Sequence, residues 1–327
     1  MTRIYRDLLG SGVRIRLAED GPADGPPILF FHGAFVDART WQATSEILSD
    51  EFRSYCPDLP GFGDSEKPPP HRFPYGIDAF TEAMVDLYGG LGIGRAAVIG
   101  QGLGAAVAIT LASRHPELVS RLVLIDAVCR PAPYRAMERM VLLPFVGGLL
   151  FKQLLGRAAY REFFRTWLVS SRSIVSLERM DDYFEKLSTP AARGSLLATL
   201  RASHDTRPIV AQTVRLCTPT LVLWGRFDRL QPPYHGQRLA REIRGAGFEL
   251  LDAGHLPEQE RPEQVADLVR RFLHSERTKE ASSRPPPRVL QSIGNDAVGG
   301  LDDRGDLSDR VDREPGAAGA AARREGG

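Results

Sequence analysis

Cysteine is scarce in this chain of 327 residues, and neither sign of charge dominates. The 3 cysteines, Cys56, Cys129 and Cys217, are far apart and form no Cys-x-x-Cys pair. We therefore expect neither a disulfide framework nor a cysteine-based zinc site. Lys and Arg total 42 against 41 Asp and Glu, a net charge of +1. Because such a chain has no strong net field, nucleic acid and anionic membranes are not expected as partners.

Long apolar runs are also missing. The longest, residues 140–151 (MVLLPFVGGLLF), is shorter than the ~18–20 residues of a membrane-spanning helix, and proline and glycine interrupt it. The opening residues, MTRIYRDLLGSG, lack the apolar stretch of a signal peptide. Together with the unpaired cysteines, these features predict a cytoplasmic protein without a stable membrane anchor.

Aromatic residues are absent after Ser275, where the composition changes sharply. Residues 276–327 contain few large apolar side chains and end in GAAGAAARREGG. Such a segment cannot bury enough apolar surface to offset the entropy lost on ordering. We therefore predict a disordered C-terminal tail over residues 276–327.

What the chain does contain is a regular alternation of short apolar runs and helical patterns. Continuous runs such as PPILFF, AAVIG, RLVLID, PTLVLWG and FELLDAG are typical of buried parallel strands. Amphipathic segments between them predict a doubly wound, mostly parallel α/β sheet. Residues 130–213 hold no clear strand. We expect a core of residues 1–129 and 214–275 with residues 130–213 inserted as a helical cap.

Polar motifs follow five of the predicted strands. They are His32-Gly33-Ala34, residues 60–65 (PGFGDS), residues 100–105 (GQGLGA), Asp228 in GRFDRLQP, and His255 after FELLDAG. In an open parallel sheet, ligands bind beyond the carboxyl ends of the strands. We therefore expect these motifs to meet in one site.

In order and spacing, these motifs resemble the α/β-hydrolase family of the AB hydrolase-1 type over roughly residues 10 to 275. The resemblance implies that His255 and Asp228 form a catalytic pair, with Asp126 as the alternative acid. Backbone N–H groups of Ala34 and Leu103 would form the oxyanion hole, since this needs no particular side chain. No metal-ligand motif is visible, and the resemblance implies no cofactor.

The chain departs from the family at the nucleophile elbow. The family pattern is G-x-S-x-G, and here Gly102 stands at the serine position. Glycine relaxes the strained turn but cannot form an acyl-enzyme. Cys129 lies close to Asp126 in the sequence, but an unpaired cysteine is more often an inert core residue.

We therefore predict a hydrolase or lyase-like enzyme in which a His255–Asp228 dyad acts on water or substrate without a serine. The expected substrate is a small apolar ester or carbonyl compound in a pocket under the cap. One alternative is a catalytically silent binding or regulatory protein on the same scaffold. A remote alternative is a dinucleotide-dependent oxidoreductase, because Gly100-x-Gly102-x-x-Ala105 also fits the G-x-G-x-x-[GA] fingerprint and Asp126 could bind a ribose.

Overall fold

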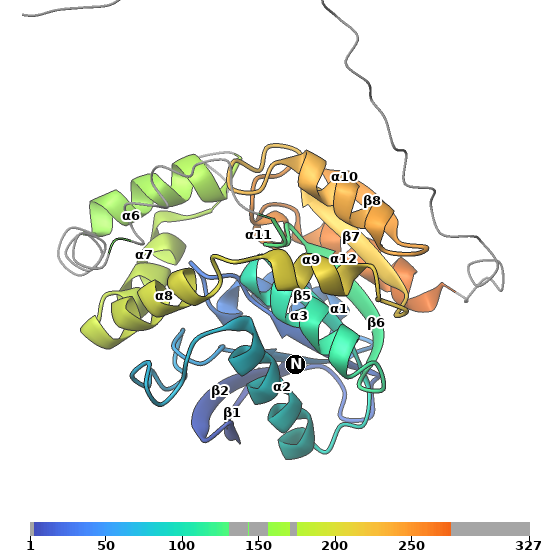
Figure 1. Ribbon diagram of the computed structural model, residues 1–327, viewed down its shortest axis with the longest axis horizontal. Helices are drawn as coiled ribbons and strands as arrows, with labels where there is room; N and C mark the ends of the chain where they lie inside the picture. The colour runs from blue at the N-terminus through green and yellow to red at the C-terminus, as the bar shows by residue number, and fades with distance from the viewer. Residues whose placement is uncertain (1–2, 131–142, 144–155, 171–174, 276–327) are drawn as a thin grey trace, which may run out of the picture. The chain divides into compact units, whose positions relative to one another are not determined.

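A single β-sheet lies at the centre of the molecule (Figure 1). The computed structural model describes residues 3–130, 143, 156–170 and 175–275. Within these residues, which belong to one compact unit, eight strands pair in the order β1-β2-β4-β3-β5-β6-β7-β8. The strands are β1 (Ile4–Gly10), β2 (Val13–Asp20), β3 (Pro27–Phe31), β4 (Arg53–Pro57), β5 (Ala96–Gln101), β6 (Val119–Ile125), β7 (Thr220–Gly225) and β8 (Gly247–Leu251). The tail predicted over residues 276–327 lies outside the described residues.

Pairing within the sheet confirms the predicted mostly parallel α/β fold. Among the strands that the structure describes, only the β1–β2 and β2–β4 pairs are antiparallel. From β4 through β3, β5, β6 and β7 to β8, neighbouring strands run parallel. The carboxyl ends of these parallel strands therefore lie along one edge of the sheet, where α/β proteins bind their ligands.

Helices cover both faces of the sheet. Their bounds are η1 (Ala38–Trp41), α1 (Gln42–Leu48), α2 (Ile77–Leu91), α3 (Leu103–Arg114), α6 (Arg157–Phe163), η3 (Phe164–Leu168), α7 (Leu177–Leu187), α8 (Pro190–Ala202), α9 (Arg207–Thr213), α10 (Pro233–Glu242), α11 (Pro257–Glu260) and α12 (Pro262–His274). Among the described residues, no helix is both long and apolar enough to cross a membrane.

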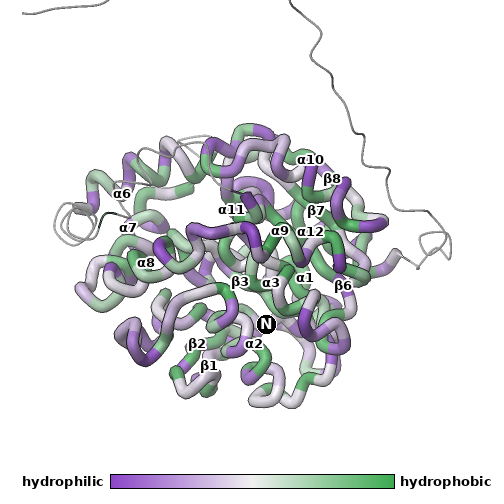
Figure 2. Tube along the Cα trace, viewed as in Figure 1, coloured by the Kyte–Doolittle hydropathy of each residue, from purple (hydrophilic) through white to green (hydrophobic). Residues whose placement is uncertain are grey.

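Two hydrophobic cores result, one on each face. In β5, Val98 packs into the core that contains α2 and α3, whereas its neighbour Ile99 packs into the core that contains α1 and α12. This opposite placement follows from the two-residue period of a strand. Helix α3 is buried over ten consecutive residues, from Leu103 to Ala112, and Figure 2 shows it among the apolar segments near the middle of the fold.

The segment between β6 and β7 contains helices but no strand in the part that the structure describes. It comprises α6, the π-helical turn η3, α7, α8 and α9. Capping residues set where two of these helices begin: Ser176 accepts a hydrogen bond from the Arg179 N–H, and Thr189 accepts one from the Ala192 N–H. Most of the apolar run over residues 140–151 lies outside the described residues.

Candidate active site

The turn between β5 and α3 holds Gly102 in a backbone conformation that side chains disfavour, with φ 55° and ψ −113°. The Gly102 N–H donates to the Ile125 carbonyl oxygen at 2.9 Å, and the Val128 N–H donates to the Gly102 carbonyl oxygen at 3.1 Å. The last residue of β6 and the segment that follows it thus fix both peptide groups of the turn. Its geometry does not depend on a side chain at position 102.

Gly100, Gly102 and Gly104 in this turn differ in how much space each leaves for a side chain. A Cβ at Gly100 would lie 2.4 Å from the Gly104 carbonyl oxygen, and one at Gly104 would lie 2.2 Å from the Phe31 carbonyl oxygen. Close backbone packing therefore requires glycine at both positions. A Cβ at Gly102 would meet nothing closer than the His255 Nε2 atom, at 3.4 Å. Position 102 therefore has room for a side chain, and that side chain would face His255.

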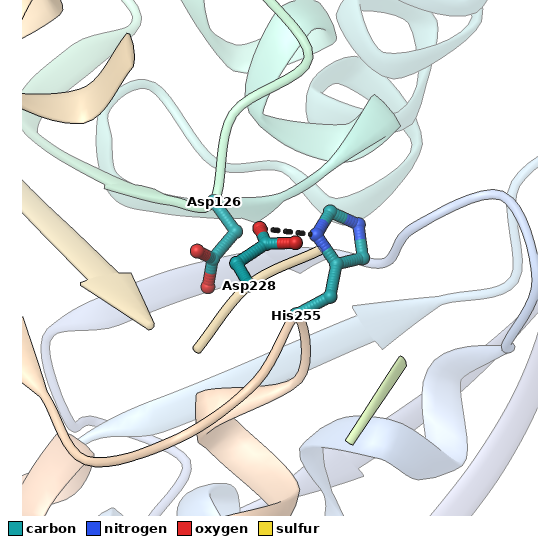
Figure 3. Close-up of side chains that lie close together, drawn as sticks. All are labelled: Asp126, Asp228 and His255. Atoms are coloured by element: carbon teal, nitrogen blue, oxygen red, sulfur yellow. Dashed lines mark hydrogen bonds and ion pairs between the residues drawn. The ribbon is translucent and has the colours of Figure 1, made fainter. Parts of the chain in front are cut away.

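His255 and Asp228 form a hydrogen-bonded pair (Figure 3). The His255 Nδ1 atom lies 2.7 Å from Asp228 Oδ2, and both residues are buried. Asp228 Oδ1 accepts the backbone N–H groups of Leu230 at 2.8 Å and Gln231 at 2.9 Å. These two donors stabilise the ionised carboxylate. Because Nδ1 is committed to Asp228, Nε2 is the ring nitrogen that faces Gly102.

Asp126, the alternative acid, lies beside this pair without hydrogen bonding to the imidazole in the described structure. It is fully buried with φ 44°, and its Oδ1 atom accepts the Gly225 N–H at 2.9 Å. Burial, and then the charge of Asp228, raise the pKa of Asp126 well above its usual range. Of the two candidate acids, the structure therefore places Asp228 against His255.

Three potential metal ligands lie together at this cluster. Among the described residues, Asp126, Asp228 and His255 are brought together with one potential ligand atom of each within 4.8 Å of the others. Asp228 accepts from His255 and from two backbone N–H groups. These hydrogen bonds orient Asp228 toward His255, as a proton-transfer pair requires.

The loop after β3 contains Ala34, whose N–H is one of the two donors predicted for the oxyanion hole. The His32 Nδ1 atom lies 2.7 Å from the Gly33 carbonyl oxygen, and the Leu59 N–H donates to His32 Nε2 at 2.9 Å. This pattern requires neutral His32 with its proton on Nδ1, and burial accordingly lowers the pKa of His32. Because a trans peptide points its C=O and N–H in opposite directions, the Ala34 N–H points away from His32. Leu103, the second predicted donor, opens α3, so its N–H has no partner within the helix.

The buried side chain of Gln101 joins two of these loops, a role that the sequence did not reveal. Its Nε2 donates to the His255 carbonyl oxygen at 2.7 Å. A Cβ at Gly33 would lie 2.1 Å from Gln101 Oε1, so the amide packs against residues 32–37, which we call the oxyanion loop after the role predicted for Ala34. Residues 252–256, between β8 and α11, are called the histidine loop. Gln101 therefore fixes the spacing between the histidine loop and the oxyanion loop.

Part of the segment between β6 and β7 also touches both loops. The Tyr160 hydroxyl donates to the Phe35 carbonyl oxygen at 2.7 Å, and the His255 N–H donates to the Leu168 carbonyl oxygen at 2.9 Å. Glu260 accepts the N–H groups of Gly254 at 2.6 Å and Ser170 at 3.0 Å. We call residues 160–170 the bridging segment, because it connects the oxyanion loop to the histidine loop.

Cys129 does not supply a substitute nucleophile. Its side chain is 1% exposed, and burial raises the pKa of the thiol to about 12. The reactive form of cysteine is the thiolate, which is scarce at neutral pH when the pKa is so high. The described residues therefore place no activated thiol beside His255.

Comparison with known proteins identifies the family. The model of the alpha/beta hydrolase family matches residues 28–268, and the chain belongs to this family. An uncharacterized protein of Mycobacterium tuberculosis is 30% identical over 310 residues, which cover 90% of this chain and 87% of the relative. A 2-hydroxymuconate semialdehyde hydrolase of Pseudomonas putida is 28% identical over 280 residues, covering 83% of this chain and 94% of that protein.

Solved structures show the same fold. The crystal structure of a hydrolase from Pseudomonas aeruginosa superimposes with a TM-score of 0.71 and 26% sequence identity, covering 83% of this chain and 98% of the other. The molecule is therefore an α/β-hydrolase-fold protein throughout its described core.

Proposed function

We propose that this protein hydrolyses a small apolar ester or carbonyl compound, with His255 and Asp228 acting on water and no acyl-enzyme formed at position 102. One observation carries the proposal. A Cβ at Gly102 would lie 3.4 Å from His255 Nε2, while His255 Nδ1 is bound to Asp228. The base therefore faces a position where a water-sized nucleophile fits in place of a side chain.

The proposed reaction begins with a water molecule between His255 Nε2 and the substrate. His255 removes a proton from the water as its oxygen attacks the carbonyl carbon, and Asp228 stabilises the imidazolium that forms. The backbone N–H groups of Ala34 and Leu103 hold the negative oxygen of the tetrahedral intermediate. When that intermediate collapses, His255 returns the proton to the leaving group.

This route is slower than one through a serine. In serine hydrolases, loss of the nucleophile costs on the order of 10⁶ in turnover. Binding and the oxyanion hole alone retain on the order of 10³–10⁴ over the reaction in water. We therefore expect the wild-type protein to accelerate hydrolysis of simple esters by on the order of 10³–10⁴ over the reaction in water.

The substrate class rests on the apolar surroundings and on the relatives. The Phe35 and Phe163 rings meet at 4.8 Å where the oxyanion loop contacts α6. The Pseudomonas putida relative is named for a small carbonyl compound. In this proposal residues 130–213 act as a cap over the core, and the substrate binds beneath the cap.

A binding protein on the same scaffold is the second candidate, favoured by the glycine at the elbow. The dinucleotide interpretation has less support. The carboxylate that would bind a ribose belongs to Asp126, which is 0% exposed and bonded to the Gly225 N–H. A titration with NAD(P) or FAD that shows no binding would remove that interpretation.

The proposal is tested with a panel of short- and medium-chain aryl esters. Wild type is compared with Gly102→Ser, and His255→Ala is made in both backgrounds. We expect slow wild-type hydrolysis that His255→Ala abolishes, and faster hydrolysis with a burst of aryl product in Gly102→Ser. If wild type and Gly102→Ser are both inactive yet fold normally, the binding protein replaces the hydrolase. If His255→Ala keeps the wild-type rate, the mechanism is wrong.

A further inference from the structure

Two carboxyl groups lie beside His255, and their hydrogen-bond partners differ. Asp228 accepts three donors: His255 Nδ1 and the backbone N–H groups of Leu230 and Gln231. Asp126 accepts one, the Gly225 N–H at its Oδ1 atom. Its Oδ2 atom is buried and has no donor among the described residues.

The two carboxyl groups cannot both be ionised at neutral pH. Asp126 is 0% exposed and Asp228 is 5% exposed, and ligand atoms of the two lie within 4.8 Å. Two like charges at this distance in a buried site repel strongly, so one carboxyl keeps its proton. Asp228 carries the charge, because three donors stabilise it. A proton on Asp126 would allow its Oδ2 atom to donate a hydrogen bond, so that this buried atom is no longer without a partner.

We propose that Asp126 is a neutral positioning residue that donates a hydrogen bond from its carboxyl O–H to Asp228 and so holds that carboxylate toward His255. The pair carries a single negative charge, located on Asp228. The inference concerns the same site as the proposed function and rests on it only for the role of His255 as a base. The direction of the Asp126 pKa shift agrees, since burial and the charge of Asp228 both favour the protonated form.

The backbone around Asp126 explains how this carboxyl is held. Its φ of 44° lies in the left-handed region, which is unfavourable for most residues with a side chain but is adopted more readily by Asp and Asn. The flanking Ile125 carbonyl oxygen and Val128 N–H bond to Gly102, and the Asp126 N–H donates to the Leu223 carbonyl oxygen at 3.2 Å. Asp126 therefore stands at the joint between the elbow and the loop that carries Asp228.

Other titratable groups face the cluster. Glu258 on α11 interacts electrostatically with Asp126 and with His255. His235 on α10 interacts electrostatically with Asp228. Burial raises the pKa of Glu258 to about 7 and lowers that of His235. A test of the Asp126 proton must therefore separate it from these groups.

The first measurement follows the downfield Nδ1–H resonance of His255 by NMR, which reports its hydrogen bond to Asp228. Asp126→Asn removes any charge at position 126 while keeping a hydrogen-bond donor, and asparagine tolerates positive φ. We expect this resonance to persist in Asp126→Asn and to be lost in the control Asp228→Asn. Loss of the resonance in Asp126→Asn as well would overturn the proposal, because it would show that a neutral donor at position 126 cannot hold Asp228 against His255.

The second measurement uses wild-type protein and does not depend on a variant that folds. At about pH 9, which is above the pKa of about 7 of Asp58 and Glu258, infrared spectroscopy reports protonated carboxyl groups through their C=O stretch. We expect such a band in wild type. Its absence would overturn the proposal.

The band is assigned by Asp126→Gly, which removes the carboxyl and accepts the positive φ without steric cost. We expect the band to disappear in that variant and to persist in Asp58→Asn. If it persists in Asp126→Gly, the proton is elsewhere and the proposal is wrong. Neither measurement needs turnover, so failure of the hydrolase proposal in the ester panel is distinguishable from failure of this one.

Discussion

The hydroxyl of Tyr160 donates a hydrogen bond of 2.7 Å to the carbonyl oxygen of Phe35, and the two residues are 125 positions apart in the chain. Phe35 directly follows Ala34 in the oxyanion loop, and Tyr160 lies on α6. The next turn of α6 adds the contact between Phe163 and the Phe35 ring. The loop that would bind the oxyanion is therefore held by a helix from outside the sheet.

Removing the Tyr160 hydroxyl tests that connection. Tyr160→Phe leaves the Phe35 carbonyl oxygen without this donor, and an unsatisfied buried group costs about 1–3 kcal/mol. We expect the free energy of unfolding to fall by that amount and the kcat of ester hydrolysis to fall more than KM rises. Urea denaturation and steady-state kinetics measure the two effects.

Tyr183→Phe is the matched control for this variant. Tyr183 is also 1% exposed, but its hydroxyl bonds to Gln259 Nε2 rather than to the oxyanion loop. The control should lose stability without the specific loss of kcat. Equal kinetic effects in the two variants would show that Tyr160 does not position the oxyanion loop.

A serine at position 102 should cost stability and add activity. The Gly102→Ser variant places a side chain at φ 55°, which costs about 1–3 kcal/mol. Its hydroxyl would reach His255 Nε2, so we expect ester hydrolysis to rise by on the order of 10² or more, with ~10⁶ as the ceiling. Gly92→Ser is the control for strain alone, because Gly92 has φ 67° with nothing within 4 Å of its Cβ position. Equal activity in the two variants would mean that His255 cannot activate a serine.

Glu260 should matter through the two segments that it joins. Glu260→Gln removes the charge that accepts the Gly254 and Ser170 N–H groups, and hydrogen bonds to a charged group are worth about 1.5–3 kcal/mol. We expect a loss of that order in the free energy of unfolding and a lower kcat, because the bridging segment and the histidine loop separate. Glu263→Gln, on the exposed start of α12, should change neither quantity. If Glu260→Gln changes neither the free energy of unfolding nor kcat, Glu260 does not join the two segments.

The pH dependence of stability should carry a contribution from Glu258. Burial raises its pKa from 4.5 to about 7, so the unfolded chain releases this proton before the folded one does. The contribution of Glu258 therefore lowers the free energy of unfolding as pH rises from about 4.5 to about 7. In Glu258→Gln that decline should be smaller by on the order of 3 kcal/mol.

Urea denaturation at several pH values checks this prediction. Glu249→Gln, at an exposed position of β8, should follow the wild-type curve. Parallel curves for wild type and Glu258→Gln would show that Glu258 ionises normally in the folded state.

The central sheet was predictable because each buried parallel strand is a continuous apolar run. The β1–β2 hairpin was not predicted. The first four residues of β1 are exposed and charged residues interrupt the strand, so no apolar run marks it. The Ser11-Gly12 pair at its turn is the one local sequence signal of the hairpin. In the structure both residues have positive φ, the conformation of a tight hairpin turn.

The site was predictable where each residue follows its own strand. Asp228, His255 and Gly102 come directly after strands whose carboxyl ends share one edge, so their meeting follows from topology. Gln101, Tyr160 and Glu260 could not be assigned in this way. Their roles arise from contacts with distant loops, and no local pattern records which carbonyl or N–H group a side chain will reach.

The backbone of the elbow has an evolutionary consequence. Because the Ile125 and Val128 peptides bond to the backbone of Gly102, we expect the turn to keep its shape with a small side chain at this position. A GGC glycine codon differs from an AGC serine codon by one base. If Gly102→Ser hydrolyses esters through a covalent intermediate, the scaffold is one substitution away from that mechanism, and selection could reach it without rebuilding the fold.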